Sequence, residues 1–523
     1  MDECLEIVGN NGKFQKNILN ICILTSLLTT VYTLMVSYLT KSSDFFIIDK
    51  TKPNEDPIHV FYSKEICDTS KYEIKKDTKS IHNWTYEFDL FCQRDYYNTY
   101  IVYSVLFGQL LGTVLLSPFP DKYGRKTIFI ILTTLSLIIH INLVLVINPI
   151  HVMICNILGG ITSFAYTMGF YLIIEYLKND MTGLALGLFN GVYPLFGVFL
   201  GFFFLTINNF RILFFITTVL SFFLTYLTFK YFAESPRWLN SIGRKKECLE
   251  VLTYISKVNN KEKEWNEFQK KHPEIIQKIG EKKNESSNKD NNTKNYNIIQ
   301  ILSFPSQRKK IICLCGLWFI SGINFYGILL NLGHLKGNFY LNGILSFIGE
   351  TISELGSGYL ADIKGRIWVM KYSAYLGSIS FLIYKFVGTN LKSLFVMSSM
   401  FGYAAIYNVL GIYIPENFPA YIRGNVTGFI IILLRLAPMN VPFLTNILGQ
   451  NVDYVFIILG FLAGFILNFL EETLGKPIIE SIPEEEEINL QNKLLKALEG
   501  KELDIKGDIL TSPNSSINSF KVK

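Results

Sequence analysis

Long apolar runs are the feature that most constrains the fold of this chain. Half of its 523 residues are hydrophobic, and apolar stretches of about 20 residues recur along it. At a rise of about 1.5 Å per residue, each stretch forms a helix long enough to cross a hydrocarbon core roughly 30 Å thick. The sequence therefore predicts an all-α membrane protein with twelve transmembrane helices. The predicted spans are residues 17–40, 98–118, 127–147, 151–174, 183–205, 211–233, 311–332, 338–361, 367–387, 391–414, 424–447 and 453–471.

Lysine and arginine residues in the short loops predict the orientation, because positive charge near a span favours the cytoplasm. They precede the first span and lie between the second and third, the eighth and ninth, and the tenth and eleventh spans. Both chain ends are therefore predicted to be cytoplasmic. The resulting segments are a cytoplasmic N-terminus (1–16), a first six-helix bundle (17–233) with an external loop (41–97), a cytoplasmic linker (234–310), a second six-helix bundle (311–471) and a cytoplasmic tail (472–523).

The predicted external loop carries one glycosylation signal and two cysteines. Asn83-Trp84-Thr85 matches the N-glycosylation acceptor pattern, which matters only on the lumenal side of a membrane. That compartment is oxidising, so a disulfide between Cys67 and Cys92 is predicted, with two unpaired thiols as the alternative.

The two sets of six helices carry the same residues at a constant separation of 241 positions, which indicates a duplication. Six helices return the chain to the side on which it began, so the repeat is parallel. Two such bundles that face each other across a cavity describe the major facilitator architecture, with a binding site near the membrane midplane. The matched pairs are Asp121 and Asp362, Gly124 and Gly365, Arg125 and Arg366, and Glu175 and Glu416.

Charged residues of both signs gather at the predicted cytoplasmic ends of the helices. We expect them to form ion pairs across the two bundles when the inside is closed, and to release these pairs to water when it opens. The alternative is that they only set the topology, although acids contribute little to orientation. The predicted gate residues are Asp121, Arg125, Glu175, Glu234, Arg237, Asp362, Arg366, Glu416 and Arg423.

Several longer motifs are typical of one transporter family. On these motifs the chain, from Cys4 nearly to Glu487, resembles the organic cation, anion and zwitterion transporter family of the major facilitator superfamily. It departs from the family pattern at Ser117 and lacks the basic residues usual after Glu175, which leaves the architecture unaffected. The motifs are residues 84–92 (WTYEFDLFC), 121–126 (DKYGRK), 233–239 (AESPRWL), 324–333 (NFYGILLNLG), 415–423 (PENFPAYIR) and 472–477 (ETLGKP).

One arginine stands in the middle of the apolar stretch 428–444, although a central charge costs a membrane helix about 2.5–3.5 kcal/mol on insertion scales. Arg435 follows Arg423 by 12 residues, and the resemblance implies that this position selects charge, with an acid in cation carriers and an arginine in anion and zwitterion carriers. A guanidinium offers paired donors suited to an oxyanion. Arg435 therefore favours carboxylate or sulfate substrates, with a structural ion pair as the alternative. Pro438 and Pro442 predict a bend just beyond it.

Two acids in the eighth span bear on the same question. Glu350 and Glu354 are four residues apart and share a helix face. The resemblance is in conflict here, because anion carriers tend to have a lysine at the position of Glu354, whereas cation and zwitterion carriers have an acid at that of Glu350. The acids either clamp a zwitterion together with Arg435, or one neutralises Arg435 and leaves the other for a cation or a proton. The remaining predicted substrate-binding residues are Tyr193, Asn324, Phe325, Tyr326, Tyr403 and Tyr407.

The sequence lacks the motifs of the competing protein classes, which are ATP-driven pumps and intramembrane hydrolases. The chain contains neither GxxxxGK followed by Ser or Thr nor HExxH, so no enzyme, cofactor or metal site is predicted. We expect a monomeric, multi-pass plasma-membrane transporter of small organic ions, with the bilayer and a substrate ion as partners, a coupling ion left open, and no nucleic acid. Anions or zwitterions are favoured. An organic cation transporter is the first alternative, and a sugar-porter-like carrier or a non-transporting membrane sensor is the second.

Overall fold

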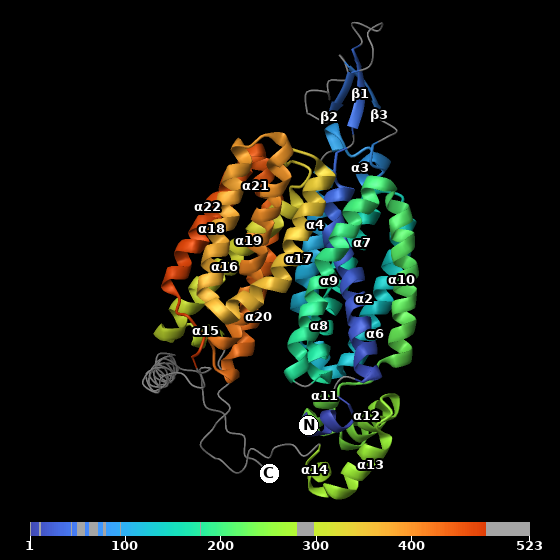
Figure 1. Cartoon of the computed structure of the whole chain (residues 1–523). Coiled ribbons are helices and arrows are strands. Elements are labelled where there is room, and N and C mark those ends of the chain that lie inside the picture. The colour runs from blue at the N-terminus through green and yellow to red at the C-terminus, as the bar shows by residue number, and fades with distance from the viewer. Residues whose placement is uncertain are drawn as a thin grey trace, which may run out of the picture.

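The computed structural model of the protein describes residues 2–9, 12–42, 44–49, 58–61, 72–76, 80–94, 96–177, 179–279 and 298–476. Two bundles of long helices lie side by side (Figure 1). A small β-sheet stands at one end of the molecule, called the sheet end below, and short helices stand at the opposite end, called the linker end.

Each bundle is built from helical segments that run back and forth between these two ends. The first bundle contains α2 (Lys13–Leu39), α4 (Tyr96–Leu116), α6 (Arg125–Val144), α7 (Pro149–Thr162) followed by α8 (Phe164–Tyr176), α9 (Asn179–Thr206) and α10 (Phe210–Tyr231). The second contains α16 (Pro305–Leu330), α17 (Phe339–Lys364), α18 (Arg366–Phe386), α19 (Thr389–Glu416), α20 (Ala420–Leu436), η4 (Ala437–Met439), α21 (Asn440–Leu448), η5 (Gly449–Asn451), α22 (Val452–Ile466) and η6 (Leu467–Phe469).

Ten helical segments among the described residues are long and apolar enough to cross a membrane. α17, with 26 residues, and α18, with 21 residues, match the eighth and ninth predicted spans in position but fall outside this apolar set. Both pack against α19, which places them inside the second bundle. The count of twelve membrane crossings therefore stays a prediction.

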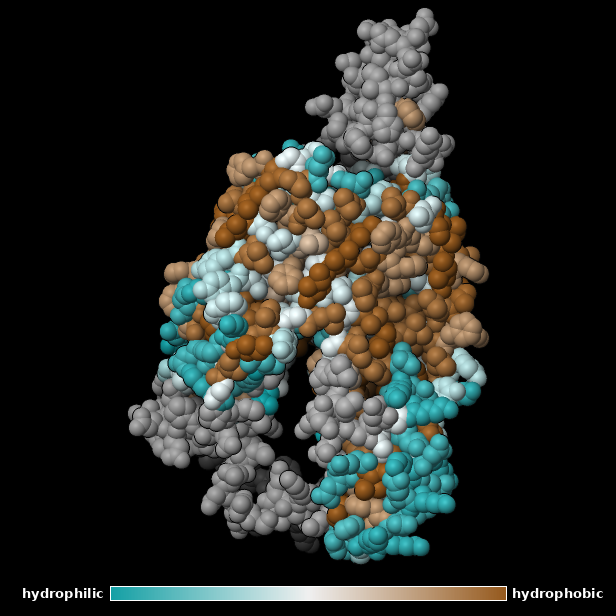
Figure 2. Space-filling model, viewed as in Figure 1, coloured by the Kyte–Doolittle hydropathy of each residue, from teal (hydrophilic) through white to brown (hydrophobic). Residues whose placement is uncertain are grey.

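Apolar side chains also cover the outer surface of both bundles. Figure 2 shows a band of hydrophobic residues across them, with hydrophilic residues gathered at the linker end. Phe222 on α10 and Ile458 on α22 are 60% and 64% exposed, respectively. A soluble monomer rarely exposes so extensive an apolar surface, so this band is the surface that contacts lipid.

Short elements occupy both ends of the molecule. At the linker end lie α1 (Asp2–Ile7), α5 (Phe119–Tyr123), α11 (Pro236–Ser241), α12 (Lys245–Val258), α13 (Glu262–Lys271), α14 (Pro273–Lys278) and α15 (Ile298–Ile301). At the sheet end lie β1 (Asp44–Asp49), β2 (Ile58–Phe61) and β3 (Tyr72–Lys76), in the antiparallel order β2-β1-β3, with α3 (Trp84–Glu87) and η2 (Cys92–Arg94).

The part of the linker just after the first bundle is folded onto the N-terminus. Asn259, which follows α12, accepts a hydrogen bond from the backbone N–H of Phe14 at 2.8 Å and donates to the carbonyl of Val8 at 2.8 Å. The sequence predicts only a charged linker here, because contacts between segments 245 residues apart leave no local pattern. The polar stretch 281–295 of the linker lies outside the described residues.

The structure encloses the side chain of Asn83, whose glycosylation stays a prediction. This residue is fully buried, and its Nδ2 donates to the carbonyls of Tyr38 at 2.8 Å and Lys41 at 2.9 Å. Its Oδ1 accepts from the backbone N–H of Tyr86 and caps α3. A glycan needs the nitrogen that this packing encloses. Of the predicted disulfide, Cys92 is disulfide-bonded, whereas Cys67 lies outside the described residues, so their pairing stays a prediction.

Asn83→Ala is expected to destabilise the protein by about 1–2 kcal/mol or more, because it removes a helix cap and two buried anchoring bonds. Asn148→Ala is the matched control, since Asn148 caps α7 through a single bond to the N–H of His151 and is exposed. Thermal unfolding in detergent compares the two variants, and the loss should be larger at Asn83. A mobility shift of the parent protein on treatment with peptide N-glycosidase contradicts this interpretation.

Candidate functional site

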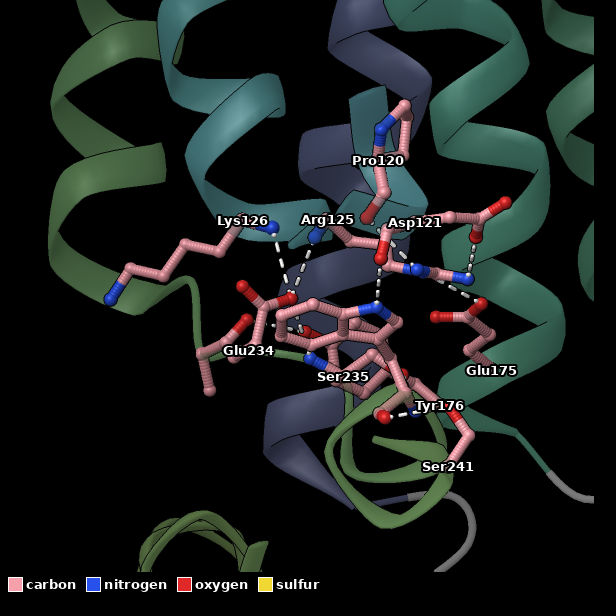
Figure 3. A network of polar contacts seen from close by, with 11 residues as sticks. Pro120, Asp121, Arg125, Lys126, Glu175, Tyr176, Glu234, Ser235 and Ser241 are labelled. Carbon is pink, nitrogen blue, oxygen red and sulfur yellow. Dashed lines mark hydrogen bonds and ion pairs between the residues drawn. The ribbon is translucent and has the colours of Figure 1, made fainter. Parts of the chain in front are cut away.

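Arg125, the first residue of α6, joins three parts of the first bundle at the linker end (Figure 3). Its Nε donates to Glu175 Oε1 of α8 at 3.1 Å, and its Nη2 lies 2.8 Å from Asp121 Oδ1 of α5. Its Nη1 donates to the carbonyl of Pro120 at 2.9 Å, and the guanidinium lies 5.6 Å from the ring centre of Trp238. These contacts fill the donors of a largely buried cation and hold α5, α6 and α8 together.

Glu234 binds the free N–H groups at the start of α6 (Figure 3). Its Oε1 accepts from the backbone N–H groups of Arg125 at 2.8 Å, Lys126 at 3.1 Å and Ser235 at 3.0 Å. The first N–H groups of a helix have no partner within it, and negative charge is favourable at that end. Because Glu234 follows α10, it ties the last helix of the bundle to the third.

The second bundle repeats this arrangement around Arg366, the first residue of α18. Its Nη2 lies 2.9 Å from Glu416 Oε1 and 3.1 Å from Asp362 Oδ1. The backbone N–H groups of Arg366 and Ile367 donate to Glu472 at 2.8 and 2.9 Å. Glu472 is the counterpart of Glu234, although it was not predicted as a site residue. Its place after the last helix of its bundle was the signal that could have found it.

A glycine precedes each of these arginines for a steric reason. Gly124 and Gly365 have φ angles of +95° and +104°, which strain any other residue. A Cβ atom on Gly124 would lie 2.4 Å from Glu234 Oε2, and one on Gly365 would lie 2.5 Å from Glu472 Oε2. The glycines therefore let each carboxylate approach the end of its helix.

The two capping carboxylates differ in how they titrate. Burial raises the pKa of Glu234 above its ordinary value, and its backbone N–H donors and Arg125 offset only part of this effect. Burial acts in the same direction on Glu472, but its four backbone N–H donors together outweigh it and hold the pKa of Glu472 below its ordinary value of 4.5. The charged form of Glu472 is thus the more strongly favoured of the two.

The structure brings most of the predicted gate residues together, but within each bundle and not across them. The exceptions are Arg237 and Arg423, which donate to the carbonyls of Leu177 at 3.1 Å and Phe418 at 3.2 Å. Figure 2 shows the surface hollowed between the bundles toward the linker end, so the bundles stand apart where cross-bundle pairs are expected. The ion pairs inside each bundle are present in this open arrangement, and the expected release of cross-bundle pairs to water stays a prediction. Pairing across the bundles stays a prediction for a state closed at this end.

Arg435 lies in the last turn of α20, which is followed by the 3-10 turn η4 around Pro438, while the predicted bend stays a prediction. Arg435 lies within electrostatic reach of the hydroxyls of Tyr326 on α16, Tyr166 and Tyr407. The Nε of Arg435 is buried without a partner. Among the described residues Arg435 forms no ion pair, so the structure does not support the alternative in which it only neutralises an acid.

Glu350 and Glu354 lie one turn apart on α17 and interact electrostatically. Glu350 is 1% exposed, and its Oε2 has no hydrogen-bond partner. Glu354 is half-buried, and its charge reaches the hydroxyls of Tyr166 and Tyr407, which Arg435 also reaches. The structure therefore gathers one cation and two acids around shared tyrosines, with polar atoms of Arg435 and Glu350 left unpaired.

Comparisons with known proteins identify the family to which these bundles belong. A family model described as Major Facilitator Superfamily matches residues 96–442. The chain belongs to the Major Facilitator Superfamily. Its fold is similar to that of the xylose transporter XylE from E. coli in an inward open conformation, with a TM-score of 0.61 and 15% identity, over 89% of this chain and 97% of that one.

The chain is also similar to individual transporters from animals. It is 24% identical to an "Organic cation transporter protein" of Drosophila melanogaster, over 93% of this chain and 94% of the relative. It is 25% identical to human "Solute carrier family 22 member 2", over 78% of this chain and 72% of the relative. The predicted resemblance to the organic ion transporter family is confirmed. This major facilitator protein is a multi-pass plasma-membrane transporter and not an enzyme.

Aromatic residues of both bundles interact with the central charged residues or stack on one another beside them. Phe325 stacks on Tyr407 at 5.4 Å between ring centres and contacts Tyr326 at 5.1 Å. Tyr193 on α9 interacts with Glu350. Tyr166 on α8 was not predicted, because its sequence neighbourhood is uniformly apolar and carries no charge pattern. The hydroxyl of Tyr166 donates to Asn190 Oδ1 at 3.0 Å, and Asn190 thereby positions it toward the charges.

Two predicted substrate-binding residues pack elsewhere. Tyr403 is fully buried, and its hydroxyl donates to the carbonyl of Phe456 on α22 at 3.3 Å. The amide of Asn324, with its oxygen and nitrogen exchanged, likewise donates to the carbonyl of Phe456 at 3.3 Å and accepts from the N–H of Gly460 at 3.2 Å. Both side chains hold their helices against α22, so their predicted contact with substrate is not supported. Polar residues that join helices and those that bind ligands look alike in a sequence.

Glu472→Gln is expected to lower the unfolding temperature in detergent more than Glu234→Gln does. Glu234 uses one oxygen for all its N–H donors, which a glutamine retains, whereas Glu472 also uses Oε2 for Ile367. A glutamine at 472 sets an amide donor against the N–H of Ile367, at a cost of about 1–3 kcal/mol. The reverse order contradicts this account.

The lowered pKa of Glu472 also predicts how the stability of the protein depends on pH. Because the folded-state pKa of Glu472 is lowered, its contribution is complete above the ordinary value of 4.5 and is lost as the pH falls through the lowered value. The stability difference between the parent and Glu472→Gln should therefore narrow below about pH 4.5. A constant difference across that range contradicts the assignment.

Proposed function

We propose that the protein moves small organic ions across the plasma membrane by alternating access, with a preference for zwitterions or anions. The observation that carries the proposal is the unpaired Arg435, which faces tyrosines shared with Glu350 and Glu354. No phosphate-binding motif is present in the sequence, so the driving force is a gradient of the substrate or of a coupled ion. We expect a single chain to suffice, because each chain holds both bundles.

A buried charge without a partner is costly, and such groups in membrane segments are kept for function. Arg435 retains buried donor capacity at Nε, and Glu350 retains buried acceptor capacity at Oε2. A zwitterion satisfies both in one molecule, with its carboxylate on the guanidinium and its ammonium on the acids. An organic anion satisfies only the first.

The main alternative is an organic cation transporter. Two acids against one arginine favour a cation if both acids are ionised, and the relatives include a protein named for organic cations. The aromatic walls of Phe325, Tyr326 and Tyr407 also suit a cation. A sugar-porter-like carrier rests on the fold alone and leaves Arg435 without a role. A non-transporting sensor predicts binding without uptake.

The structure corresponds to one of the two conformations that a transport cycle requires. Hydrogen bonds join the bundles at the sheet end, for example from Ser37 on α2 to the carbonyl of Leu329 on α16 at 2.5 Å. With the predicted orientation, this is the inward-facing state. Closure of the linker end then requires the bundles to rock as rigid bodies, after which charges such as Asp121 and Arg366 are expected to exchange partners between bundles.

The test is uptake of labelled zwitterions, anions and cations into proteoliposomes that contain the parent, Arg435→Gln or Glu350→Gln. Arg435→Gln is expected to lower uptake of carboxylate-bearing substrates by roughly tenfold or more, because a charge-assisted bidentate contact is lost. Glu350→Gln should lower zwitterion and cation uptake and spare anions. Tyr326→Phe removes a hydroxyl within electrostatic reach of Arg435, and Tyr403→Phe, which removes a hydroxyl that faces α22, is its matched control. An unchanged substrate ranking in Arg435→Gln overturns the preference, and no uptake of any substrate by the parent overturns transport.

A further inference from the structure

Tyr38, near the end of α2, fills the seam between the two bundles at the sheet end. It is fully buried, and its ring stacks on Phe204 of α9 at 5.2 Å and meets Phe339 of α17 edge-on at 5.1 Å. Phe204 belongs to the first bundle and Phe339 to the second. One aromatic ring thus bridges the interface that must part if the sheet end opens.

Two glycines make room for the hydroxyl of this tyrosine. A Cβ atom on Gly343 of α17 would lie 2.2 Å from Tyr38 Oη, and one on Gly201 of α9 would lie 3.2 Å from it and 2.4 Å from Ile344. One turn before Gly201, a Cβ on Gly197 would lie 2.5 Å from the ring of Phe347. Gly197 and Gly201 therefore form a small-xxx-small pair that lets α9 approach α17 closely across the bundles.

Within the described part of the chain, the enclosed hydroxyl of Tyr38 has no hydrogen-bond partner. A buried unpaired hydroxyl destabilises the arrangement that encloses it, and exposure to water removes the penalty. The stacked rings favour the closed seam, whereas the enclosed hydroxyl favours opening. These opposed effects in one residue keep two states close in free energy, as a transport cycle requires.

We propose that Tyr38, seated between Gly201 and Gly343, is the gate that closes the sheet end and sets the balance between the closed and open states. The proposal rests on the alternating-access transport proposed above. It adds the residue that governs the outer side and the reason that α9 and α17 carry glycine there. Its test measures conformation and needs no substrate.

The test introduces Ser37→Cys, since Ser37 is 4% exposed in the seam, and follows its labelling by a membrane-impermeant maleimide added to the outside of intact cells. Gly343→Ala in this background is expected to label about tenfold faster, because its methyl group displaces the Tyr38 hydroxyl from the closed seam. Tyr38→Phe is expected to label several-fold more slowly, because the enclosed hydroxyl is gone. The double variant Gly343→Ala with Tyr38→Phe should return toward the parent rate, since the nearest remaining atom is then Tyr38 Cζ at 3.1 Å.

Gly356→Ala on the same helix is the matched control, because a Cβ there meets no atom within 4 Å, and its labelling should equal that of the parent. Gly201→Ala is the second variant and should also label faster, should Gly343→Ala fail to yield a monodisperse protein in detergent. Labelling of both glycine variants at the parent rate, or no restoration by Tyr38→Phe, overturns the gate. A labelling response in a protein that takes up none of the tested ions supports the gate and refutes only the transport proposal.

Discussion

Two carboxylates at the linker end are the contacts on which the remaining architecture depends. Glu234 and Glu472 each bind the free N–H groups at the start of the third helix of a bundle, from a position just after its last helix. Each bundle is thereby closed upon itself, and Arg125 and Arg366 add ties to the fourth helix through Glu175 and Glu416. Two bodies held in this way can tilt against each other without losing their internal contacts.

The division into two bundles also separates the central charged residues from some of the tyrosines that interact with them. Arg435, Glu350 and Glu354 all belong to the second bundle, whereas Tyr166 and Tyr193, which sense them, belong to the first. A ligand held between these sets is in contact with both bodies at once. Its binding energy is therefore available to bias their relative tilt, which a site confined to one bundle does not allow.

Much of this arrangement was predictable because local or repeated sequence patterns indicate it. Helix positions followed from apolar length, and a constant separation singled out Arg125, Arg366 and their acidic partners, although pairing across the bundles was expected and the observed pairs lie within each bundle. The packing role of Asn83 was not predicted, since a glycosylation motif does not reveal that its amide donates to the carbonyls of Tyr38 and Lys41. Tyr166 was not predicted, and the contact of Tyr403 with α22 was not foreseen, because only the rotation of a helix decides which of its aromatic residues face a neighbouring helix.

The polarity of α17 has a consequence for how the protein is made. This helix carries Glu350 and Glu354, and it is not among the helices apolar enough to enter a bilayer by composition alone. Packing of α17 against α19 and α9 provides the stabilising contacts that lipid does not provide for so polar a helix. During synthesis α17 emerges after α9 and before α19, so one of these two packing partners is still missing when α17 reaches the membrane. We therefore expect the membrane integration of α17 to depend on helices that both precede and follow it, because Glu350 and Glu354 make it too polar to enter the bilayer by composition alone.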